Sequence, residues 1–159
     1  MKALSLMPFW ADFVAFGGKT IECRTWQTDY RGDLLICASS RRISGFISGK
    51  AMCIVELTDI EPFTRKHLDA AGMEPDMMPD SPSFAWHLDN LLWIDPFDVK
   101  GRLHLFDVDD ELIHPLPPIE TEEQCEKAIR EHYLQHVYFA KGDDEAREWW
   151  SERAGCEVK

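Results

Sequence analysis

The chain has 159 residues, of which 45% are hydrophobic and 29% charged, which suits one compact core better than two full domains. It carries 17 Lys and Arg against 29 Asp and Glu, a net charge of −12, and this excludes strong nonspecific binding to a phosphate backbone. The acidity is uneven. Residues 1–106 hold 11 basic and 14 acidic side chains, whereas residues 107–159 hold 6 and 15. A specific pocket for one nucleotide or a short single strand is therefore still allowed in the first part.

The cysteines and the hydropathy pattern predict a reducing, soluble, cytoplasmic setting. The five cysteines are an odd number and form no Cys-x-x-Cys pair. The N-terminus does not read as a secretory signal, and no stretch approaches the length of a membrane span, so we expect no membrane association.

The first half of the chain predicts one early helix followed by short strands. An apolar run at 11–16, closed by two glycines, favours a helix. Residues 20–26 alternate between polar and apolar side chains, as in a strand with one polar face. The runs at 34–39 and 51–60 are apolar on both faces and indicate buried strands, and 62–82 predicts a short helix followed by an irregular loop.

Two further strands are expected at 84–94 and 101–108, separated by Asp95-Pro96. Several short strands with one early helix favour a small β-barrel, so the expected fold class is mixed α/β (α+β).

The last third of the chain predicts helices. Three prolines between 115 and 118 form a stiff linker, and Thr121 with Gln124 forms a capping box that starts a helix. A second short helix is expected at 145–153. We expect residues 109–159 to be an acidic helical extension packed on a domain formed by residues 1–108.

The densest polar signal lies on the strand at 20–26 and at its entry. Glu22 and Arg24 fall on one strand face about 7 Å apart, with Lys19 at the entry and Trp26 beside them. A cation, a carboxylate, a guanidinium and an indole on one face suit a polar, planar ligand such as a nucleobase. The alternative is an exposed ion pair that contributes little to stability.

An ordered series of motifs gives a more specific interpretation. Gly-x-Lys-x-x-Glu-x-Arg-x-Trp at 17–26 follows Leu4-Ser5 and Trp10-Ala11, and Tyr30-Arg31-Gly32 and Ala38-Ser39 come after it. Phe84-Ala-Trp86 and Pro96-Phe97-x-Val99-Lys100-Gly101 complete the series. Over about residues 1–108 this pattern resembles the ASCH domain of the PUA-like superfamily. The resemblance implies a small PUA-like β-barrel with a cleft over the Lys-x-x-Glu-x-Arg strand, and recognition of RNA or a modified nucleoside.

Seven side chains are therefore candidates for binding the ligand. They are Lys19, Glu22, Arg24 and Trp26, with Ser39, Glu56 and Trp86 as wall residues. Some members of the family resemble hydrolases of N-acetylated cytidine, and in that alternative Lys19 and Glu22 are catalytic, with Glu56 as another proton relay. No cofactor is expected. The His132-x-x-x-His136 pair lacks an evident third ligand, so no metal site is expected either.

One departure from the hydrolase pattern favours binding over catalysis. Small amidohydrolase members carry a Thr three residues after the Lys, where this chain has Glu22. A carboxylate there keeps Lys19 charged, whereas a lysine acts as a base or nucleophile only when its pKa is lowered. A third alternative is a protein-interaction module that recruits a partner through the C-terminal helices and Trp149-Trp150.

Overall fold

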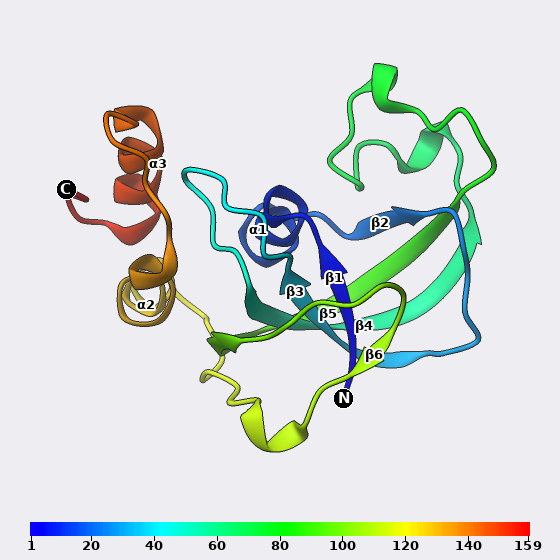
Figure 1. Cartoon of the computed structure of the whole chain (residues 1–159), viewed down its shortest axis with the longest axis horizontal. Coiled ribbons are helices and arrows are strands. Elements are labelled where there is room, and N and C mark those ends of the chain that lie inside the picture. The colour runs from blue at the N-terminus through cyan, green and yellow to red at the C-terminus, as the bar shows by residue number, and fades with distance from the viewer.

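The computed structural model describes residues 1–159 and is built on one mixed six-stranded sheet, with the strand order β2-β5-β4-β3-β1-β6 (Figure 1). The strands are β1 Lys2–Leu6, β2 Ile21–Arg24, β3 Gly32–Ala38, β4 Lys50–Pro62, β5 Phe84–Asp98 and β6 Phe106–Asp107. The α-helices are α1 Pro8–Phe16, α2 Glu122–Ala128 and α3 Asp144–Ala154. Shorter helical turns are η1 Arg65–His67, η2 Pro75–Met77, η3 Asp110–Leu112, η4 Ile129–Tyr133 and η5 Leu134–His136.

Strand β1 is the element that the sequence analysis did not assign. Its five residues pair in parallel with β3, with Ser5 opposite Cys37 and Leu6 opposite Ala38. The strand is short because Pro8 follows it and starts α1, where a proline is favoured in the first turn. Because the two strands are parallel, the C-terminal ends of β1 and β3 lie side by side, next to the start of α1.

The expected barrel is not closed. Strands β2 and β6 are the two edges of the sheet and do not pair with each other. The strand expected at 101–108 is reduced to the two residues of β6, because residues 100–104 are exposed and lie outside the ladder. Strand β5 instead continues through Asp95-Pro96. The β4–β5 register shifts there, and a proline, which has no N–H to donate, is tolerated at such an irregularity.

The predicted C-terminal helices are confirmed. Thr121 Oγ1 accepts a hydrogen bond from the Gln124 amide at 3.1 Å, and Gln124 Oε1 accepts one from the Thr121 amide at 3.2 Å. Helix α2 begins at Glu122, the residue after Thr121. Helix α3 ends at Gly155, whose φ of 63° is the left-handed conformation that favours glycine.

The C-terminal segment shares the main core with the sheet. The Tyr133 hydroxyl donates to the Met52 carbonyl of β4 at 2.9 Å, and the Trp150 indole donates to the Gly45 carbonyl at 2.8 Å. Trp150 is fully buried, and the Trp149 ring packs 3.6 Å from the Arg153 guanidinium. The two tryptophans therefore pack within the protein.

All five cysteines are unpaired thiols. None of the helices combines the length and the apolar character that crossing a membrane requires.

Candidate functional site

A cavity of about 630 Å³ opens where the ends of β1 and β3 meet β2, α1 and the β5–β6 connection. Its lining combines apolar, hydroxyl and charged side chains. The lining residues are Ser5, Leu6, Met7, Trp10, Glu22, Cys23, Arg24, Ser39, Ser40, Lys100, Gly101, Arg102 and Leu103.

Lys19 lies behind this cavity wall. Its Nζ donates to the Ala71 carbonyl at 2.6 Å, lies 3.4 Å from Glu22 Oε1, and sits 4.7 Å from the centre of the Trp10 ring. Burial lowers the pKa of Lys19, and the Glu22 carboxylate opposes that shift. The ammonium is thus engaged by the protein on several sides, and Lys19 supports Glu22 from the interior.

Glu22 and Arg24 project from β2 into the cavity, as the alternation of the strand predicts. Glu22 is buried, and its Oε2 lies 3.3 Å from Arg24 Nη2. The same Nη2 donates to the Ser5 carbonyl of β1 at 2.9 Å. Arg24 Nε is buried and has no hydrogen-bond partner within the protein, although buried donors of this kind are usually satisfied. The structure therefore brings Lys19, Glu22 and Arg24 together around one cavity wall.

Ser39 also lies on the wall, at the end of β3. Its amide donates to the Leu6 carbonyl at 2.7 Å, which continues the β1–β3 pairing and turns the side chain of Ser39 to the cavity.

The two tryptophan candidates, Trp26 and Trp86, do not line this cavity. Trp86 is fully buried, and its indole donates to the Trp26 carbonyl at 3.2 Å. The Trp26 ring lies edge-to-face against the rings of Trp86 and His104, at 4.7 and 4.6 Å between centroids. Because His104 belongs to the β5–β6 connection, Trp26 supports the segment that covers the cavity.

Glu56 is also away from the cavity lining. It lies in the middle of β4, and its Oε2 accepts a hydrogen bond from Asn90 Nδ2 of β5 at 2.6 Å, beside a shift in the β4–β5 register. Its interruption of an apolar strand is explained by this local contact.

Trp10, Lys100 and Arg102 are cavity side chains that are absent from the seven candidates and that can contribute to binding. Trp10 and Lys100 both occur in the motif series, so the series could have indicated them as candidates. The alternation of polar and apolar residues in β2 does not predict these three residues. That pattern concerns one strand, whereas Trp10 lies on a helix and the two cations lie on a loop.

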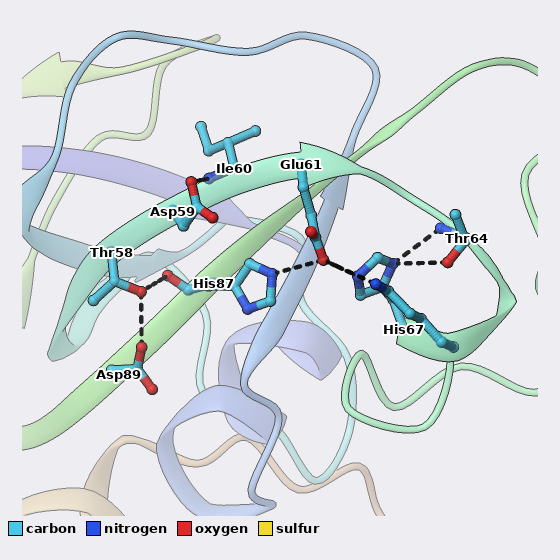
Figure 2. Close-up of polar contacts among 9 residues, drawn as sticks. Thr58, Asp59, Ile60, Glu61, Thr64, His67, His87 and Asp89 are labelled. Atoms are coloured by element: carbon cyan, nitrogen blue, oxygen red, sulfur yellow. Dashed lines mark hydrogen bonds and ion pairs between the residues drawn. The ribbon is translucent and has the colours of Figure 1, made fainter.

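A second polar cluster joins β4, β5 and η1 (Figure 2). Glu61 Oε1 lies 2.5 Å from His67 Nε2 and 3.3 Å from His87 Nε2, and the three side chains are close enough to share a metal ion. His67 Nδ1, however, accepts the Thr64 amide proton at 2.9 Å. A neutral His67 then carries its proton on Nε2, the atom that a metal would need, and Lys66 Nζ adds positive charge 3.8 Å from Glu61. The geometry therefore fits a hydrogen-bonded clamp better than a metal centre.

This clamp is connected to the cavity through the backbone. His67 is held by Glu61, and its carbonyl accepts from the Ala71 amide at 3.0 Å. The Ala71 carbonyl in turn accepts from Lys19. Glu61 and His67 thus fix the segment against which Lys19 is held.

The comparisons with known proteins agree with the motif series. A family profile described as "ASCH domain" matches residues 4–152, which extends the resemblance beyond residue 108 into the C-terminal helices. The solved structure of ASCH from Zymomonas mobilis is 15% identical, with a TM-score of 0.53 over 69% of this chain and 88% of that one. A serine-to-alanine mutant of the same protein gives 16% identity and a TM-score of 0.56, over 69% and 89%. At this identity the likeness shows the fold alone. The search of curated proteins gives no match.

Proposed function

Since the chain belongs to the ASCH domain family, we propose that its cavity binds a nucleobase, presented by RNA or by a modified nucleoside. The observation that carries this proposal is the placement of Glu22 and Arg24 side by side on one cavity wall, 3.3 Å apart. A carboxylate accepts from an exocyclic amine and a guanidinium donates to a carbonyl, which are the groups that a base presents along its edge.

The other lining residues support the same ligand class. Trp10 contributes an indole to the wall, and bases stack on aromatic faces. Ser39 and Ser40 add hydroxyl groups that can donate or accept. Arg24, Lys100 and Arg102 oppose the single carboxylate of Glu22, so the cavity lining is cationic although the chain as a whole is acidic.

The position of Lys19 favours binding over catalysis. Its Nζ is held by the Ala71 carbonyl and by Glu22, and its side chain is 1% exposed. A nucleophile or general base must reach the substrate atom directly or through one water. Lys19 stands behind Glu22 relative to the cavity and acts as a support for that carboxylate.

Binding can be tested by calorimetric titration at low salt with cytidine, N-acetylated cytidine and a short single-stranded RNA. We expect wild-type protein to bind at least one of these, and Arg24→Ala to weaken that binding about tenfold or more, as loss of a charged hydrogen bond does. Arg65→Ala is the matched control, because Arg65 is exposed and lies outside the cavity lining.

A second variant, which fills the cavity, separates loss of binding from loss of folding. Ser40 is exposed and lines the cavity, so Ser40→Trp should fill the cavity without burying new volume in the core. Ser81→Trp is its exposed control away from the cavity. Absence of binding in the wild type, or binding that neither Arg24→Ala nor Ser40→Trp weakens, contradicts the proposal.

Hydrolysis of N-acetylated cytidine is a second candidate, favoured by one observation. Burial lowers the pKa of Lys19, which is the direction a base requires. Incubation with N-acetylated cytidine, followed by its ultraviolet change, tests this activity. Turnover that is lost in Lys19→Met and retained in Arg65→Ala supports it, and no turnover in the wild type rejects it.

A further inference from the structure

Two cations at the cavity have no acidic partner. Lys100 and Arg102 line the cavity from the β5–β6 connection, and neither takes part in an ion pair. The geometry points to a phosphate subsite formed by these two side chains, so that the ligand is a nucleotide, not a phosphate-free nucleoside. This inference rests on the proposed function of the cavity and specifies its ligand class.

The other lysines near this connection are paired with carboxylates. Lys50, one neighbouring cation, pairs with Asp98 at 2.6 Å, and Lys2 pairs with Asp107 at 3.0 Å. The carboxylates that flank the connection are therefore already neutralised by other lysines. Within the cavity lining, Arg24 pairs with Glu22, so Lys100 and Arg102 are the two cations that no carboxylate of the protein neutralises, and an anionic group of the ligand can do so.

The segment that carries the two cations is held in place at three points. The Val99 amide donates to the Gly49 carbonyl at 3.1 Å, and the His104 ring packs on Trp26. Between them Gly101 lies directly against β1, since a Cβ at this position would come within 2.5 Å of Ser5 Oγ. The close approach of Gly101 fixes the backbone on either side of it, and this brings Lys100 and Arg102 to the cavity beside the Arg24–Ser5 contact.

A phosphate group matches this donor set. The guanidinium of Arg102 offers a planar fork of N–H donors, and Lys100 offers a compact charge, which together suit the oxygens of a phosphomonoester or phosphodiester. Arg24 lines the same cavity, and the hydroxyls of Ser39 and Ser40 are further donors. The phosphate can belong to a free nucleoside monophosphate or to a residue of single-stranded RNA.

The test compares four ligands by calorimetric titration at low salt: cytidine, cytidine 5′-monophosphate, a short single-stranded RNA and inorganic phosphate. Cytosine is the probe because it presents an amine to Glu22 and a carbonyl to Arg24. We expect the monophosphate or the RNA to bind about tenfold or more tightly than cytidine. In the Lys100→Ala/Arg102→Ala double variant, that advantage should disappear, so that the phosphorylated ligands bind no more tightly than cytidine does.

The control is Arg65→Ala/Lys141→Ala, which removes the same number of charges from exposed positions that make no ion pair and lie outside the cavity lining. It should retain the advantage of the phosphorylated ligand. A higher affinity for RNA than for the monophosphate identifies RNA as the source of the phosphate, and the reverse order identifies a free nucleotide. Equal affinities for cytidine and both phosphorylated ligands overturn the phosphate subsite and leave the proposed function standing. Failure of all nucleoside-containing ligands to bind overturns both.

Discussion

Lys19 and Glu22 form an ion pair, 3.4 Å from Nζ to Oε1, in which the two side chains are only 1% and 8% exposed. A buried carboxylate is costly unless it is paired, and Glu22 is held by Lys19 on one side and Arg24 on the other. The pair therefore keeps a charged acceptor at the wall of the cavity.

Replacing Lys19 should destabilise the protein through Glu22. Lys19→Met retains most of the side-chain volume but leaves a buried carboxylate with one partner fewer, so we expect a loss of about 3 kcal/mol in the free energy of unfolding. The loss should shrink in a Glu22→Gln background, where no buried charge is left behind. Urea unfolding of the two single variants and the double variant measures this coupling. Equal losses in both backgrounds contradict it.

The clamp at Glu61 should make stability depend on pH in the acid range. Hydrogen bonds from His67 and then His87 lower the pKa of Glu61 below its ordinary value of 4.5. A lowered folded-state pKa contributes stability that is complete above the unfolded-state pKa and is lost as pH falls through the folded-state pKa. Glu61→Gln should therefore lose less stability than the wild type on going from pH 7 to below pH 4.5. Glu148→Gln, at an exposed carboxylate, should follow the wild-type curve.

The clamp should also protect the start of β2. The amides of Thr20 and Ile21 donate to the Ala70 carbonyl at 2.9 and 3.2 Å, on the segment that His67 anchors. His67→Ala should cost about 1–3 kcal/mol and raise hydrogen exchange at these two amides. Unchanged exchange there, with stability lost elsewhere, shows that the clamp does not support the cavity.

Local patterns in the sequence predicted most of the elements and part of the site. The alternation in β2 predicted that Glu22 and Arg24 share a face, and the capping box at Thr121 predicted the start of α2. Both depend on short-range geometry, which a sequence displays directly.

Long-range features were beyond these patterns. The position of the Trp26 ring depends on the path of the β5–β6 connection, because the ring packs on His104. The burial of Trp86 depends on the path of the chain after β2, because the indole of Trp86 donates to the Trp26 carbonyl and packs against the Trp26 ring. The open sheet depends on whether two distant edge strands meet, which no local signal specifies.

The C-terminal segment should be required for the stability of the sheet. The Tyr133 hydroxyl donates to Met52 and accepts from the Ile94 amide at 3.3 Å, so it satisfies two buried backbone groups. Tyr133→Phe leaves both without that partner, and we expect a loss of about 1–3 kcal/mol by urea unfolding. Tyr138→Phe is the matched control, because that ring packs on Arg42 and its hydroxyl makes no hydrogen bond within the protein. Losses of similar size in the two variants contradict the role of Tyr133.

Mapping of backbone amide shifts by nuclear magnetic resonance, during titration with cytidine 5′-monophosphate, tests the location of the binding site most directly. The largest shifts should fall on the cavity wall, at Cys23, Arg24, Ser39 and Gly101, with little change at Glu56. Large shifts confined to other parts of the surface, or no shifts at saturating ligand, contradict the assignment of this cavity as the nucleobase site.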